Sequence, residues 1–122
     1  MSKILVVDDD LFIGEMLGFM LGAKGYLVDF STKPEQTVDN ILQNGIHLVM
    51  LDHFIFDTSG VEICRELKRN KNTTHVPILM MSGQSTLEKK CLTAGATDFI
   101  SKPFEMHVLF SKIETILKQI KT

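Results

Sequence analysis

Five short runs of aliphatic and aromatic residues recur along the chain, and a segment of helical character follows each run. We expect strands at residues 3–7, 26–30, 47–52, 76–81 and 97–101. Most of these runs are nearly unbroken by polar residues, which is typical of strands in a parallel sheet that is covered on both faces. With right-handed crossover connections, the pattern predicts a doubly wound α/β fold, a (βα)5 three-layer sandwich with strand order 2-1-3-4-5.

Capping patterns mark the helices between these strands. Asp10 is expected to cap a first helix that Gly25 closes, and a capping box from Thr32 to Glu35 opens a second helix that stops at Gly45. The remaining helices are expected from a second capping box at Ser59–Glu62 to about Asn70, and from about Thr86 to Ala94 with Gly95 as C-cap. Pro103 precedes a last helix that reaches the region of Ile120.

Length and composition are those of an ordinary globular protein and narrow its location and partners. With 122 residues, 44% hydrophobic and 23% charged, the chain is expected to form one domain over residues 1–122. A net charge of −2 predicts no direct binding of nucleic acid, and no apolar run approaches the roughly 20 residues that span a bilayer. The apolar start ends in three acids, unlike a secretory signal, and Cys64 and Cys91 are expected as reduced core thiols. These features predict a cytoplasmic protein without membrane insertion.

Charged and polar residues stand where the expected strands end. Asp8 and Asp9 follow the first strand, Asp52 closes the third, Ser82 follows the fourth and Lys102 follows the fifth. In a doubly wound parallel sheet, ligands bind outside the carboxyl ends of the strands, where the strand order reverses. With the order 2-1-3-4-5, the first and third strands are neighbours, so their acidic residues converge at that point.

The chemistry of these side chains points to phosphoryl transfer. Converging carboxylates repel one another unless a cation lies between them, and an all-oxygen donor set favours a hard divalent ion, Mg²⁺ or Mn²⁺. Mg²⁺ keeps several of its waters, which leaves room for a phosphate oxygen. Lys102 adds a positive charge and Ser82 a hydroxyl group. Asp52 would then be a buried carboxylate that serves as the nucleophile.

Four segments, in order and spacing, resemble the receiver domain of bacterial two-component response regulators, the chemotaxis-regulator-like family. They are VVDDD (6–10), LVMLD (48–52) with Gly60 eight residues after the aspartate, PILMMSG (77–83) and AGATDFISKPF (94–104). Each segment alone is weak evidence, whereas four in register are strong evidence. The resemblance covers the whole chain and implies the flavodoxin-like fold of that family.

The resemblance also implies a role for each acidic residue. Asp52 would be the phosphoacceptor. Asp8 and Asp9 would hold Mg²⁺ together with Asp52, and the backbone carbonyl of Phe54 would complete the protein ligands. Asp10 is left to cap the first helix.

Three further residues would respond to the phosphoryl group. Lys102 would pair with the incoming phosphoryl oxygens, and Ser82 would close on the phosphate once it is attached. Phe99 would be the switch aromatic, moving inward as Ser82 shifts. The family also implies a cis peptide bond between Lys102 and Pro103.

The function implied in this way is phosphorylation-controlled signalling, not turnover of a separate substrate. The domain would catalyse only its own aspartyl phosphorylation and dephosphorylation. Its phosphodonor would be a sensor histidine kinase or a phosphotransfer protein. An output domain or target protein, and a second copy of the chain in a phosphorylation-dependent homodimer, are the further candidate partners.

Four positions depart from the family pattern or need their own interpretation. The loop after the phosphoacceptor usually carries proline where this chain has Phe56. Phe54 and Gln84 occupy positions that influence the access of water to the acyl phosphate, and a hydrophobic Phe54 predicts moderate to slow self-dephosphorylation. Because neighbouring strand residues point to opposite faces, His53 is expected to be structural or partly solvated and not catalytic.

Other functions of an α/β sandwich fit less well. A dehalogenase-like phosphatase with an aspartate nucleophile would need a second acid where Phe54 stands. A flavodoxin-like electron carrier would need a phosphate-binding first loop, which the three successive acids oppose, and a dinucleotide fold would need GxGxxG. A degenerate receiver that acts only through protein contacts is the remaining alternative, and the retained set of site residues argues against it.

Overall fold

The central sheet of the protein has five parallel strands. The structure is a computed structural model that describes residues 1–120. The strands are β1 (Lys3–Val7), β2 (Leu27–Ser31), β3 (Leu48–Asp52), β6 (Ile78–Ser82) and β7 (Asp98–Ser101). Their order, β2-β1-β3-β6-β7, is the predicted order 2-1-3-4-5. From β1 the chain continues to β2 on one side of the sheet, and from β3 it continues to β6 and β7 on the other side. The strand order therefore reverses between β1 and β3, which are neighbours.

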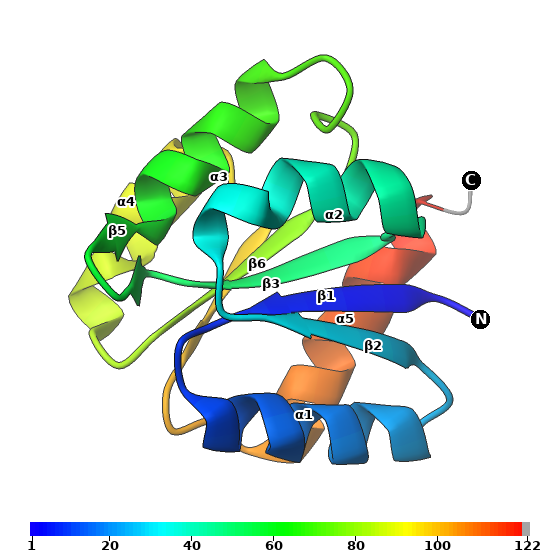
Figure 1. Cartoon of the computed structure of the whole chain (residues 1–122). Coiled ribbons are helices and arrows are strands. Elements are labelled where there is room, and N and C mark those ends of the chain that lie inside the picture. Colours follow the sequence, from blue (N-terminus) through cyan, green and yellow to red (C-terminus); the bar gives the residue numbers. More distant parts are fainter. Residues whose placement is uncertain (121–122) are drawn as a thin grey trace.

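Helices cover both faces of this sheet (Figure 1). They are α1 (Leu11–Ala23), α2 (Thr37–Asn44), α3 (Gly60–Arg69), α4 (Glu88–Thr93) and α5 (Met106–Ile120). Residues of α1 and α5, such as Leu17 and Ile113, pack with one face of the sheet, and residues of α2, α3 and α4, such as Ile41 and Cys64, pack with the other. The predicted α/β three-layer sandwich is therefore confirmed.

Strand residues fill both halves of the core because alternate side chains point to opposite faces. In β3, Val49 and Leu51 join the half under α2, α3 and α4, while Leu48 and Met50 join the half under α1 and α5. All five residues of β3 are buried. This burial explains why the strand reads as an unbroken apolar run, and it leaves Asp52 as a charged residue at the end of a fully buried strand.

Two of the three predicted helix caps are present in the structure, and the third is not. Asp10 caps α1 by accepting hydrogen bonds from the backbone N–H groups of Phe12 and Ile13. Ser59 caps α3. The capping box at Thr32 is wrong, because a 3₁₀ turn begins at Pro34, whose fixed φ suits a first helical position, and its N-cap is Lys33. No membrane-spanning helix is present within residues 1–120.

A small hairpin, not predicted from the sequence, follows Asp52. Strands β4 (Phe54–Ile55) and β5 (Thr58–Ser59) pair antiparallel between β3 and α3. The hairpin is tied to the end of β3 because the N–H of Gly60 donates a 2.7 Å hydrogen bond to the carbonyl of His53. It therefore holds the segment after Asp52 at the same edge of the sheet as the acidic residues.

Candidate functional site

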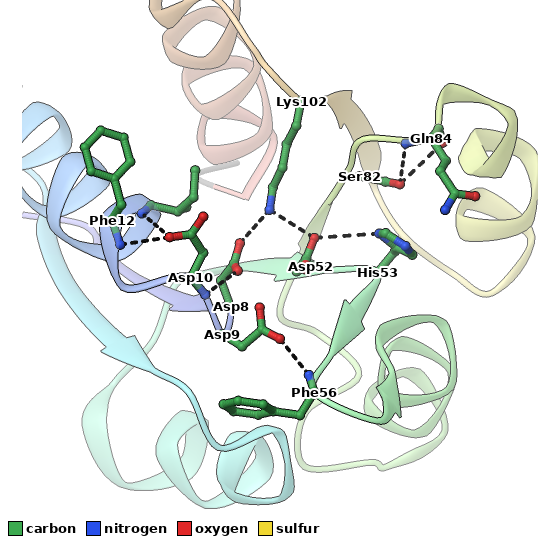
Figure 2. Close-up of polar contacts among 11 residues, drawn as sticks. Asp8, Asp9, Asp10, Phe12, Asp52, His53, Phe56, Ser82, Gln84 and Lys102 are labelled. Carbon is green, nitrogen blue, oxygen red and sulfur yellow. Dashed lines mark hydrogen bonds and ion pairs between the residues drawn. The ribbon is translucent and has the colours of Figure 1, made fainter.

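The carboxyl ends of four strands bring the predicted site residues to one edge of the sheet. Asp8 directly follows β1, Asp52 ends β3, Ser82 ends β6 and Lys102 directly follows β7. Because β1 pairs with β3 in parallel register, with Val7 opposite Leu51, the two following aspartates are also neighbours. Figure 2 shows these side chains converging above the ends of the strands.

Three of the carboxylates form a compact cluster. One oxygen from each of Asp8, Asp9 and Asp52 lies within 4.8 Å of the others. Asp8 is fully buried and Asp52 is 7% exposed. Asp10 is turned away to cap α1, although its N–H donates a 3.0 Å hydrogen bond to Asp8 Oδ1. The three successive aspartates thus divide between a cluster that can hold a cation and a helix cap.

Lys102 supplies the positive charge of the cluster. Its Nζ lies 2.7 Å from Asp8 Oδ2 and 3.1 Å from Asp52 Oδ1. Burial lowers the pKa of Lys102, but the hydrogen bond to Asp8 and the negative charges of Asp52 and Asp8 together raise it above its usual value. The ammonium group is therefore firmly charged. The cis peptide bond between Lys102 and Pro103 that the family resemblance implied is present.

The electrostatics of Asp52 are dominated by burial. Burial raises the pKa of this carboxyl, Lys102 lowers it and Asp8 raises it again, with a net effect above the ordinary value. A carboxylate with a raised pKa is one whose charge is costly in the folded state, and a bound cation would relieve that cost. Perturbation of this kind by burial and specific charged neighbours is typical of functional sites.

Ser82 ends the neighbouring strand β6, and its hydroxyl is hydrogen-bonded to the backbone of Gln84. Its side chain is fully buried, and its Oγ accepts a 2.9 Å hydrogen bond from the N–H of Gln84 (Figure 2). Phe99, on β7, is 4% exposed and packs in the core under α2, α3 and α4. The aromatic ring is therefore already in an inward position in this structure.

Phe56 contacts the acidic cluster through its backbone. Its N–H donates a 2.8 Å hydrogen bond to Asp9 Oδ2, and its φ is +56°. A proline here could make neither feature, because it lacks an N–H and its φ is fixed near −65°. The departure from the family pattern at this position thus has a defined structural counterpart. Nothing in the sequence signalled it, because a left-handed phenylalanine has no local motif.

His53 lies closer to Asp52 than strand alternation predicted. Its Nδ1 is 3.7 Å from Asp52 Oδ1, and its side chain is 23% exposed. The expectation that His53 is partly solvated is confirmed, but the expectation that it points away is wrong. The reason is that β3 ends at Asp52, so the two-residue period of the strand no longer governs the next residue.

The donor set fits a hard divalent cation. The oxygens of Asp8, Asp9 and Asp52 are carboxylate ligands of the kind that Mg²⁺ and Mn²⁺ prefer, and within the described residues no cysteine joins the cluster. Three acids against one lysine also leave a local excess of negative charge. A divalent cation would balance that excess.

The sequence is similar to that of known proteins over nearly its whole length. Residues 4–114 match the family model described as response regulator receiver domain. The chain is 32% identical over 121 residues to response regulator ArlR of Staphylococcus haemolyticus, which covers 98% of this chain and 54% of that protein. It is 33% identical over 120 residues to the phosphate regulon transcriptional regulatory protein PhoB of Pseudomonas aeruginosa, covering 97% and 52%. The chain thus spans about half the length of the curated relatives it matches.

Solved structures show the same architecture over nearly the whole chain. A two-component response regulator from Clostridium difficile superposes with a TM-score of 0.90 at 26% identity and covers 100% of both chains. The receiver domain of NtrX from Brucella abortus gives a TM-score of 0.85 at 27% identity, covering 94% of this chain and 98% of that one. From the family match, the relatives and the shared fold together, the chain belongs to the response regulator receiver domain family.

Proposed function

We propose that this chain, as a single receiver domain over residues 1–122, accepts a phosphoryl group on Asp52 from a sensor histidine kinase or a phosphotransfer protein. The observation that carries the proposal is the position of Asp52. Its carboxylate lies 3.1 Å from Lys102 Nζ and belongs to the same cluster as Asp8 and Asp9. A nucleophile, a cation site and a fixed positive charge are the parts that phosphoryl transfer requires.

In the proposed step, a carboxylate oxygen of Asp52 attacks the phosphorus of a phosphohistidine or of a small acyl phosphate. The new O–P bond forms as the bond to the donor breaks, and the donor leaves with the electron pair of that bond. The leaving imidazole takes up a proton. Lys102 stabilises the negative charge on the transferring oxygens, because its ammonium group already lies beside Asp52.

Asp8, Asp9, Asp52 and the backbone carbonyl of Phe54 would hold the cation, Mg²⁺ or Mn²⁺. When bound, it would neutralise charge on the phosphoryl oxygens. Asp9 would bind it through its carboxylate while Oδ2 accepts the hydrogen bond from Phe56, whereas Asp10 stays engaged as the cap of α1.

The proposed signal is a rearrangement around Ser82 and Phe99. An aspartyl phosphate adds roughly two negative charges and new acceptor oxygens at the end of β3. The hydroxyl of Ser82 would leave Gln84, its present partner, and donate to a phosphoryl oxygen. Phe99, whose ring is already inward, would be held there as the switch aromatic once Ser82 shifts, and this would fix the surface offered to an output domain, a target protein or a second copy of the chain. Its relatives' names include transcriptional regulators, which makes an output domain beyond this segment the favoured target.

The test is the intact mass of the protein after incubation with acetyl phosphate, with and without Mg²⁺. Wild type should gain about 80 Da, the mass of one phosphoryl group, only when Mg²⁺ is present. Asp52→Asn should gain nothing. Asp57→Asn is the matched control, because it removes an exposed carboxylate five residues away and should be labelled like wild type. If wild type neither gains the mass nor binds beryllofluoride, the domain acts only through protein contacts.

A further inference from the structure

One buried polar atom beside Asp52 has no partner. His53 Nδ1 is shielded from solvent and makes no hydrogen bond with any described residue. Leaving such a group unpaired is unfavourable, so buried unpaired atoms in native proteins usually have a reason. The atom faces the candidate phosphoacceptor, since Asp52 Oδ1 at 3.7 Å is its polar neighbour.

The backbone fixes His53 in this position. Its N–H donates a 3.0 Å hydrogen bond to the carbonyl of Met81 on β6, and its own carbonyl accepts from Gly60 at 2.7 Å. The residue is therefore held between β6 and the start of α3. These two bonds fix the backbone from which the imidazole projects beside Asp52.

The carboxylate of Asp52 also determines which tautomer of the His53 imidazole is favourable. A neutral imidazole has one N–H donor and one acceptor nitrogen. An acceptor lone pair aimed at a carboxylate is repulsive, so the form with the proton on Nδ1 is favoured here. The 3.7 Å separation is too long for a hydrogen bond, and Asp52 Oδ1 already pairs with Lys102. Nδ1–H is thus a donor directed at the site but not used by it.

We infer that His53 is a phosphoryl-binding residue, whose Nδ1–H donates a hydrogen bond to an oxygen of the aspartyl phosphate on Asp52. This inference rests on the proposed function. Phosphorylation adds acceptor oxygens to Asp52 within reach of a donor that is short of a partner. In Figure 2, His53 and the Asp8–Asp9 pair lie on opposite sides of Asp52, so the phosphoryl group is held by the cation site on one side and by the imidazole on the other.

The inference predicts which substitutions preserve the effect. Asparagine places an amide N–H close to the position of Nδ1 and keeps the donor. Phenylalanine keeps the ring without a donor, and leucine removes both. His75 is exposed and lies at the opposite end of β6, so His75→Leu removes a histidine without touching the site.

The experiment is calorimetric titration with beryllofluoride, a phosphoryl mimic, at saturating Mg²⁺. His53→Phe and His53→Leu should each bind about tenfold more weakly than wild type, as expected for loss of one hydrogen bond to a charged group. His53→Asn should stay within about threefold of wild type, and His75→Leu should be unchanged. The affinity for Mg²⁺ alone should be equal in all of them, because Nδ1 is not a metal ligand in this proposal.

Two results would overturn the inference. Binding of His53→Phe and His53→Leu as tight as that of wild type would show that the imidazole contributes nothing. His53→Asn as weak as His53→Leu would show that the ring acts by packing and not by donation. Failure of the proposed function is distinguishable, because wild type itself would then not bind beryllofluoride, or Asp52→Asn would bind it as well as wild type does.

Discussion

Asp9 and Phe56, 47 positions apart, are joined by a 2.8 Å hydrogen bond from the backbone N–H of Phe56 to the carboxylate of Asp9. The bond links a candidate metal ligand to the loop that follows the phosphoacceptor. Phe56 donates this hydrogen bond with its backbone at φ +56°. Phe56 is the one non-glycine residue with positive φ within residues 1–120. The loop therefore combines backbone strain with a charge-assisted hydrogen bond.

Substitutions at Phe56 should separate these two contributions. Phe56→Gly should be more stable to urea than Phe56→Ala by about 1 kcal/mol, because a left-handed backbone is strained for any residue with a Cβ. Phe56→Pro should be less stable than Phe56→Ala by about 2 kcal/mol, since proline abolishes the bond to Asp9 and cannot adopt this φ. Equal stabilities of the glycine and alanine variants would contradict the strain at this position.

The charge on Asp52 should destabilise the metal-free protein. Burial, the largest effect, raises the pKa of Asp52 above its ordinary value of 3.8. The unfolded chain therefore loses this proton at a lower pH than the folded protein, and folding stability falls as the pH rises through the folded-state pKa. Asp52→Asn should be about 1–2 kcal/mol more stable than wild type at pH 7 in EDTA.

The pH dependence of this difference is the sharper measurement. Urea unfolding of wild type and Asp52→Asn between pH 3 and pH 7, at intervals of about half a unit, should show a gap that is small at low pH and grows toward neutrality. Asp57→Asn, which changes an exposed acid, should show no such growth. A gap for Asp52→Asn that is constant across the range would contradict the raised pKa.

Lys102 should stabilise the metal-free fold far more than an exposed lysine does. Lys102→Met leaves the buried carboxylates of Asp8 and Asp52 without their cation and should lower the free energy of unfolding by about 2–4 kcal/mol. The matched control is Lys112→Met, which breaks a more exposed 3.0 Å pair with Asp98 and should cost at most about 1 kcal/mol.

Millimolar Mg²⁺ should recover part of the loss in Lys102→Met, because a divalent cation replaces the missing positive charge among the carboxylates. Thermal unfolding midpoints with and without Mg²⁺ measure this recovery. Lys112→Met should gain no more from Mg²⁺ than wild type does. If Mg²⁺ stabilises Lys102→Met no more than it stabilises Asp52→Asn, the acidic cluster does not hold the ion.

Periodicity and strand ends were sufficient to predict the fold and the convergence of the site. The runs 4–7 and 48–51 are apolar because they are buried on both faces of the sheet, and this burial is visible in sequence. The topology then forces Asp8, Asp52 and Lys102 together, whatever their side-chain conformations. Long-range geometry of this kind follows from parallel pairing alone.

The features that sequence reasoning missed depend on single backbone conformations. The β4–β5 hairpin has only two residues in each strand, too few for a periodic signal. The left-handed Phe56 and the inward turn of His53 result from tertiary hydrogen bonds to Asp9, Met81 and Gly60. Such bonds override local preference, so no local pattern could reveal them.

Gly60 should be the least replaceable glycine near the site. A Cβ at this position would lie 1.9 Å from the backbone oxygen of Asp52, and backbone cannot move aside cheaply. Gly60→Ala should therefore lower the free energy of unfolding by about 3 kcal/mol or more. Gly18, in the middle of α1 with open space around its Cβ position, is the control. Gly18→Ala should raise stability by about 0.5–1 kcal/mol, and similar effects at both positions would contradict the close approach.

Phe54 should slow the loss of the phosphoryl group from Asp52. Its side chain is 51% exposed, two residues after the phosphoacceptor, where an apolar ring limits the approach of water. Phe54→Asn offers an amide that can orient an attacking water, so the aspartyl phosphate should decay about fivefold faster. The measurement is the loss of the phosphoryl mass with time after the phosphodonor is removed, at fixed Mg²⁺. Phe56→Asn is the control, because it changes another exposed aromatic farther along the loop and asparagine tolerates its positive φ. Equal decay rates for wild type and Phe54→Asn would remove Phe54 from the list of residues that set the lifetime of the signal.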